Sequence, residues 1–172
     1  YVKETKAPAG YLLDGNKYPV TVSDTAKEIK VYPVESADQV IRGDIELIKA
    51  EDGTLDRMAN VKFSITNKLT GESHVFITDE NGYYSTAAEW NKHTQNTNKG
   101  ESPEDGIWFG GSEPDDGKGA LPYGVYTIEE LRCEANAGHK LVKFDVSIKR
   151  DNYTVNLGTV TNDLEKQIEI GT

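Results

Sequence analysis

The sequence contains a single cysteine, Cys133. One cysteine cannot form an internal disulfide, and it cannot supply a zinc site built from several thiolates. Positive charge is also scarce, because 19 lysine and arginine residues face 29 aspartate and glutamate residues, for a formal net charge of -10. Since nucleic acids and anionic membrane surfaces attract clustered positive charge, neither is an expected partner.

Long apolar runs are absent too. No stretch approaches the roughly 20 apolar residues that a membrane-spanning helix needs, so direct membrane contact is not expected. Residues 1–10 lack the basic and apolar regions of a signal peptide, and we therefore expect the chain to be a piece of a longer one. His74, His93 and His139 have no carboxylate or cysteine at ligand spacing, so we expect them on the surface or in turns, with no metal and no other cofactor.

The residues that are present favour strands. The chain of 172 residues has 16 glycines, 9 tyrosines and only one methionine, and it is long enough for one packed domain and part of another. Turn residues at 79–82 and 150–152 predict two antiparallel hairpins. We expect an all-β, antiparallel β-sandwich of the immunoglobulin-like or prealbumin-like kind. Alternating apolar and polar residues place its strands at 44–50, 61–67, 73–78, 125–132, 141–149 and 153–161.

A long polar stretch interrupts this pattern at residues 87–119. It is rich in asparagine, lysine, glycine and acidic residues but includes Trp108 and Phe109, so we interpret it as an inserted surface loop with an aromatic anchor. We expect these two rings to pack on the sandwich. Residues 91–105 are almost entirely polar and are expected to stay mobile.

The beginning of the chain repeats part of its end. The segment 4–11 parallels 130–139, and Glu4 to Ser36 spans as many residues as Glu130 to Asn162. Strand-like stretches at 17–23 and 28–34 follow the first copy. We therefore expect three parts, which are the end of a preceding domain at 1–41, one complete domain at 42–165, and the start of a following domain at 166–172.

Three predicted strands each carry one polar side chain at the end of an apolar face. Because side chains alternate along a strand, Lys49 shares a face with Ile45 and Leu47, and Asn162 shares one with Val160. Glu130 follows Tyr126 and Ile128 in the same way. Any one of these residues alone could simply reach solvent, but the coincidence of all three points to a shared site.

If the three side chains meet in the core, burial favours the uncharged forms of both Lys49 and Glu130. A neutral amine held against the Asn162 carboxamide could attack it, with Glu130 as the acid that polarises the carbonyl and relays protons. The product is a Lys49–Asn162 isopeptide bond. Such a bond would supply the covalent closure that disulfides would otherwise provide.

Five short motifs resemble those of the CnaB, or SpaA-type, domains of Gram-positive pilins and surface adhesins. They are ETKAPAGY at 4–11, IELIKAED at 45–52, ANVKF at 59–63, TDENGY at 78–83 and YTIEE at 126–130. The resemblance implies that Lys49 is the donor, Asn162 the acceptor and Glu130 the catalytic acid. The end of the chain, at 168–172, resembles the opening of a VaFE-type repeat.

The resemblance also implies a role and a place. It describes a structural stalk or adhesin module on the cell-wall-associated, extracellular surface of a Gram-positive bacterium, without enzymatic turnover, whose partners are neighbouring domains of the same protein. In the first copy Ser36 stands where the acceptor asparagine would be, with Asp38 two residues on, so no cross-link is expected there. An alternative function is binding of a glycan or host protein, with Trp90, Trp108, Phe109 and Tyr123 as an aromatic platform.

Overall fold

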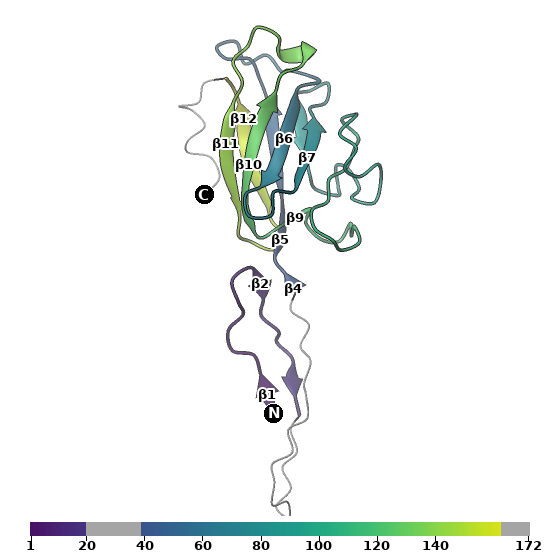
Figure 1. Cartoon of the computed structure of the whole chain (residues 1–172), viewed down its shortest axis with the longest axis vertical. Helices are drawn as coiled ribbons and strands as arrows, with labels where there is room; N and C mark the ends of the chain where they lie inside the picture. Colours follow the sequence, from purple (N-terminus) through teal and green to yellow (C-terminus); the bar gives the residue numbers. More distant parts are fainter. Residues whose placement is uncertain (20–38, 163–172) are drawn as a thin grey trace, which may run out of the picture.

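The computed structural model describes residues 1–19 and 39–162, and it has the form of a β-sandwich with short strands extending from one end (Figure 1). One sheet consists of antiparallel strands in the order β11-β10-β6-β7. Their bounds are β6 (Lys62–Asn67), β7 (Ser73–Ile77), β10 (Gly124–Leu131) and β11 (Lys143–Ile148).

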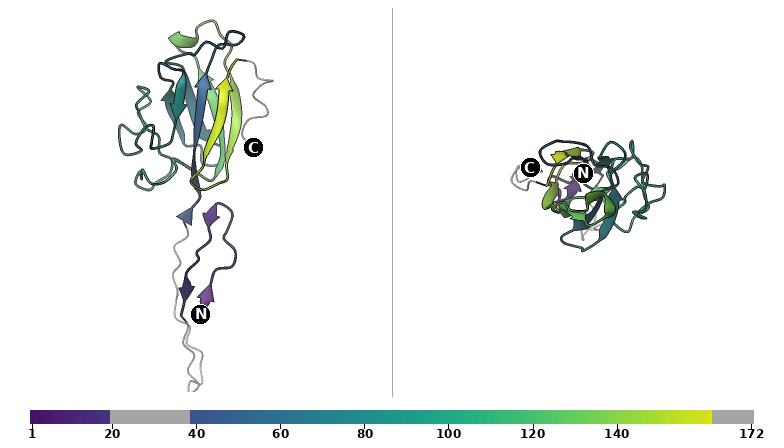
Figure 2. Two further views of the ribbon diagram at one scale, coloured as in Figure 1. Left: turned by 180° about the vertical axis from the view of Figure 1, so that it is seen from behind. Right: turned by 90° about the horizontal axis from the view of Figure 1, so that it is seen from above.

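The second sheet lies behind the first, and its face is visible in Figure 2. Its order is β12-β5-β8, with β5 (Arg42–Lys49) in the middle, flanked by β8 (Tyr83–Ser85) and β12 (Thr154–Val160). Strand β9 (Leu121–Pro122) pairs with the start of β5, and a short 3₁₀ turn, η1 (Glu134–Asn136), follows β10. The predicted β-sandwich is confirmed, although β12 runs parallel to β5.

Both turns that were expected to close hairpins instead carry the chain from one sheet to the other. Residues 79–82 join β7 to β8, and residues 150–152 join β11 to β12, yet neither pair shares a sheet. The turn chemistry itself is as expected, because Gly82 and Asn152 have φ values of +69° and +53°. The hairpin prediction was wrong because a turn signal does not tell which sheet the next strand joins.

The core lies between the two sheets and is largely aromatic. Phe63 on β6 stacks on Phe76 of β7, which in turn stacks on Tyr84 of β8, with ring centroids 5.2 and 4.6 Å apart. These rings connect the two sheets directly. Strands β5 and β10 add alternating apolar side chains, including Ile45, Leu47, Tyr126 and Ile128. Among the described residues no helix is long and apolar enough to cross a membrane.

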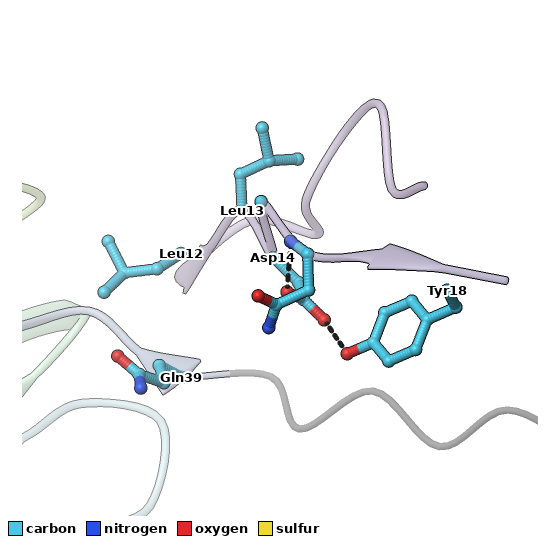
Figure 3. Close-up of a pocket in the computed structure, with 7 residues that line it drawn as sticks. Leu12, Leu13, Asp14, Tyr18 and Gln39 are labelled. Carbon is cyan, nitrogen blue, oxygen red and sulfur yellow. Dashed lines mark hydrogen bonds between the residues drawn. The ribbon is translucent and has the colours of Figure 1, made fainter. Parts of the chain in front are cut away.

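The N-terminal segment forms two small antiparallel pairs. Strand β1 (Val2–Lys3) pairs with β3 (Lys17–Tyr18), and β2 (Tyr11–Leu12) pairs with β4 (Gln39–Val40). Figure 3 shows the Tyr18 hydroxyl donating to the Asp14 carboxylate at 2.6 Å, while Leu13 remains 51% exposed. The expected strand at 28–34, most of the one at 17–23, Ser36 and Asp38 lie outside the described residues.

The insertion at 87–119 is anchored to the sandwich by Arg42 of β5. The Arg42 guanidinium donates to the backbone oxygens of Gly119 and Phe109 at 2.7 and 2.5 Å. It also stacks over the Trp108 ring, 3.7 Å from the centroid. The Phe109 ring packs edge-on against Tyr126 in the core. The expectation that Trp108 and Phe109 pack on the sandwich is therefore confirmed.

The expectation that residues 91–105 stay mobile is wrong. His93 is fully buried, with its ring nitrogens 2.7 and 3.0 Å from the backbone oxygens of Thr86 and Asp115. The Tyr84 hydroxyl donates to the backbone oxygen of Asp105 at 2.9 Å. The polar side chains of this segment thus make internal hydrogen bonds. His93 was expected on the surface or in a turn; it lies in a turn, but its side chain is buried.

Candidate functional site

Lys49 is the last residue of β5, and its side chain is fully buried. Its backbone is held on both sides, because Lys49 N–H donates to the Gly82 oxygen at 2.7 Å and Met58 N–H donates to the Lys49 oxygen at 2.9 Å. A Cβ on Gly82 would lie 2.5 Å from the Lys49 oxygen, so only glycine fits there. The backbone at the end of β5 is therefore held in place, and the Lys49 side chain extends from it into the core.

Glu130 lies near the end of β10, between Phe63 of β6 and Val142, whose backbone oxygen accepts from Glu130 N–H at 2.8 Å. The Glu130 side chain is fully buried, and neither carboxyl oxygen has a hydrogen-bond partner among the described residues. Its nearest charged group is the Lys49 amine, with Nζ and Oε1 3.3 Å apart. A buried carboxyl with so few partners is costly in a purely structural role.

Asn162 follows the end of β12 by two residues. Its Oδ1 accepts from Lys49 Nζ at 3.0 Å, across 113 residues of chain. Its Nδ2 donates to the backbone oxygen of Lys140, which lies in the connection before β11. The carboxamide is thus oriented by one contact at its oxygen and one at its nitrogen, with the oxygen facing the buried amine.

These contacts bring together the three residues that sequence analysis singled out. Burial lowers the pKa of Lys49, while the charge of the nearby Glu130 acts in the opposite direction. A neutral amine is a nucleophile, and here it lies within hydrogen-bond distance of a carboxamide oxygen and beside a carboxyl group. The described residues contain no cluster of three metal-ligating side chains.

The four aromatic residues considered as a ligand platform do not share one surface. Trp108 and Phe109 are buried, with exposed fractions of 3% and 0%, whereas Trp90 and Tyr123 are 44% and 39% exposed. The prediction of a single aromatic platform was therefore wrong, because the Trp108 and Phe109 rings are buried and attach the insertion to the sandwich. Trp90 packs edge-on against Tyr83 at the other end of the insertion.

Sequence reasoning missed several parts of the site. The backbone oxygen of Lys140 and the close approach of Gly82 to Lys49 depend on how connections fold over the end of the sandwich. The glycine in the Asn81–Gly82 pair was recognised as a turn signal, but nothing in its spacing indicates that it lies against Lys49.

The solved structures that are similar to this chain include three proteins from Gram-positive bacteria. The Bacillus anthracis TIE protein matches with a TM-score of 0.52 and 24% identity, over 92% of this chain and 24% of that one. BcpA, the major pilin subunit of Bacillus cereus, matches with a TM-score of 0.42 and 21% identity, over 72% and 31% of the two chains. GBS52, the minor pilin of Streptococcus agalactiae, matches with 0.44 and 16%, over 72% and 46%.

The likeness to the TIE protein supports the β-sandwich fold and nothing further at this level of identity. The chain spans about a quarter of the length of that protein and less than half of either pilin. No protein-family model matches the chain, and no curated protein does either. The function must therefore be argued from the site.

Proposed function

We propose that the chain forms an intramolecular isopeptide bond between Lys49 and Asn162, with Glu130 as the acid that assists it. The observation that carries this proposal is the position of Lys49 Nζ, 3.0 Å from Asn162 Oδ1 and 3.3 Å from Glu130 Oε1, with the Lys49 and Glu130 side chains fully buried. A purely structural ion pair would not explain why the second carboxyl oxygen of Glu130 is buried without a hydrogen-bond partner among the described residues. It would also not explain why the Asn162 carboxamide lies against the same amine.

The proposed reaction conserves atoms. The neutral Lys49 amine attacks Asn162 Cγ, and Glu130 in its protonated form donates to Oδ1 as negative charge develops there. The carboxyl group then returns a proton from the attacking nitrogen to the leaving amide nitrogen, and the C–N bond to Nδ2 breaks. One new amide and one ammonia result. The backbone oxygen of Lys140 contacts Nδ2 and lies where ammonia would leave.

The module that carries such a bond is best understood as a mechanical or protease-resistant part of a bacterial surface protein. Its support is the sequence resemblance to CnaB domains, the lack of any disulfide, and the sandwich fold shared with the TIE protein. The bond would join the first long strand to the end of the last, so that pulling on the ends of the sandwich loads a covalent link. Neighbouring domains of the same protein are the expected partners.

Peptide mapping tests the bond itself. Trypsin should fail to cleave after Lys49 in the wild-type chain and should release a branched peptide that contains both Lys49 and Asn162. Cleavage after the exposed Lys68 serves as the control within the same sample. Linear peptides that end at Lys49 with a free amine would contradict the proposal.

The pH dependence of stability should reveal the buried amine when the bond cannot form. In an Asn162→Ala variant the folded-state pKa of Lys49 lies below its ordinary value of 10.5, because burial disfavours the charged form. The unfolded chain then binds more protons between the two pKa values, so stability should rise with pH up to about 10.5 and fall as pH drops through the folded pKa.

Urea unfolding of Asn162→Ala between about pH 7 and pH 10 measures this effect, with the double variant Asn162→Ala, Lys49→Met as the matched control. The double variant lacks the titrating amine and should not show that rise. If both variants have the same dependence on pH, Lys49 is not buried as a free amine.

Ligand binding remains the second candidate, with Trp90 as the exposed ring. Trp90 lines a shallow pocket between the insertion and the connection from β7 to β8, and Asp79, Glu80, Asn91 and Glu104 also line it. The acidic surroundings favour a cationic group over a neutral glycan. A pull-down with the intact chain and with Trp90→Ala would separate this role from the isopeptide bond, which does not involve the insertion.

A further inference from the structure

The last strand of the sandwich contains one residue more than its partner. Strand β12 pairs with β5 in parallel, with Asn156 opposite Glu46 and Thr159 opposite Ile48. Between these pairs β12 has two residues, Leu157 and Gly158, and β5 has only Leu47. Two residues opposite one define a β-bulge, which is rare between parallel strands.

The bulge changes which side chains of β12 face the core. Leu157 and Val160 are both buried, although they are three positions apart. On a regular strand, residues an odd number of positions apart face opposite sides. Val160 is the last residue of β12, so without the bulge it would face away from the core, and the two residues that lead to Asn162 would continue from the opposite face of the strand.

Local chemistry holds the bulge in place. Gly158 has a φ of +68°, a value that side chains other than glycine and asparagine rarely adopt. The Asn156 side chain accepts from Gly158 N–H at 2.8 Å, which closes the turn of the bulge. A Cβ at position 158 would meet nothing within 4 Å, so the backbone angle, and not space, requires glycine there.

We propose that this bulge is the positioning device that turns the Asn162 side chain toward Lys49. Gly158 and Asn156 are then positioning residues for the cross-link, although both are exposed and neither touches the reacting atoms. The inference rests on the proposed isopeptide bond. It assigns to two exposed residues a role in a buried reaction.

Two substitutions separate the backbone angle from other effects. Gly158→Val places a β-branched side chain at a positive φ, a conformation that such residues rarely adopt, and this lets the regular strand compete. Cross-linking should therefore slow about tenfold or more. Gly158→Asn introduces a side chain that tolerates this angle and should react within about twofold of the wild type. Asn156→Ala, which removes the bond to Gly158 N–H, should slow the reaction to a smaller degree.

Deletion of Gly158 provides the decisive comparison. Without this residue Leu157 faces Leu47 and Thr159 faces Ile48 in one-to-one pairing, so Val160 and Asn162 still point inward. We expect the deletion variant to cross-link faster than Gly158→Val. If Gly158 were needed only for folding, deleting it would slow cross-linking at least as much as Gly158→Val does.

The measurement is the fraction of full-length chain that has lost ammonia at fixed times after cell-free synthesis, with each sample quenched in guanidinium chloride. Equal rates for wild type and folded Gly158→Val would overturn the proposal, and so would a folded deletion variant that never cross-links. If the wild type itself loses no ammonia, the proposed function fails. The positioning claim is then tested by NMR proximity between the Lys49 and Asn162 side chains, which Gly158→Val should weaken and the deletion should keep.

Discussion

The Asn162→Ala variant should unfold with a free energy about 4–5 kcal/mol lower than that of the wild type. The bond closes a loop across 113 residues, and in the chain-entropy model a loop of this size restricts the unfolded chain by that amount. The melting temperature should fall by about 10–20 °C. Differential scanning calorimetry of both proteins, with the mass of each sample checked, gives the comparison.

A matched control separates the bond from the loss of a polar side chain. Lys68 forms an exposed ion pair with Asp145, and Lys68→Ala should change stability by less than about 1 kcal/mol while leaving the cross-link intact. Lys49→Ala should be at least as destabilising as Asn162→Ala, because it also leaves a cavity and a buried, unpaired Glu130. A wild-type melting temperature equal to that of Asn162→Ala would show that no covalent closure exists.

Phe109→Ala should lower the free energy of unfolding by about 3–5 kcal/mol, although residue 109 belongs to an inserted loop. Its ring is fully buried and packs edge-on against Tyr126 and His74, with centroids 5.2 and 4.6 Å apart. Denaturant unfolding monitored by circular dichroism measures the change. The expected size is that of a core residue because the insertion completes one end of the core.

Trp90→Ala is the control for this second prediction. Trp90 lies in the same insertion but is 44% exposed and has one aromatic contact, to Tyr83, so its loss should cost about 1 kcal/mol. If Phe109→Ala and Trp90→Ala destabilise the chain equally and weakly, the insertion is a surface loop that does not contribute to the core.

Much of the fold, and the choice of Lys49, Glu130 and Asn162 as site residues, could be predicted from the alternation of apolar and polar residues along the strands. Period-two patterning shows which residues share a face, and this placed Lys49 and Glu130 inside. For Asn162 the same rule gave a correct local parity with Val160, but it could not show that the strand changes parity at Gly158. A bulge leaves only a glycine and a preceding asparagine as its signal, and both residues also occur in ordinary turns.

The insertion could not be predicted for a different reason. The buried His93 ring is held by the backbone oxygens of Thr86 and Asp115, and the backbone oxygen of Asp105 accepts from the Tyr84 hydroxyl. The amino-acid composition of the segment does not indicate any of these partners. Similarly, Arg42 precedes the predicted strand at 44–50 and belongs to no motif in the sequence, yet it contacts Gly119, Phe109 and Trp108 and anchors the insertion. Polar composition indicated mobility where tertiary hydrogen bonds produce order.

The intact mass of the wild-type chain, measured together with that of Glu130→Ala, tests the central claim most directly. The account predicts that the wild type weighs one ammonia less than its sequence, and that Glu130→Ala has the full sequence mass although it retains both Lys49 and Asn162. A wild-type mass equal to the sequence mass would contradict the bond. Loss of ammonia in Glu130→Ala would contradict the role of Glu130 and leave the neighbouring Glu129, whose side chain points outward, as the next carboxyl to test.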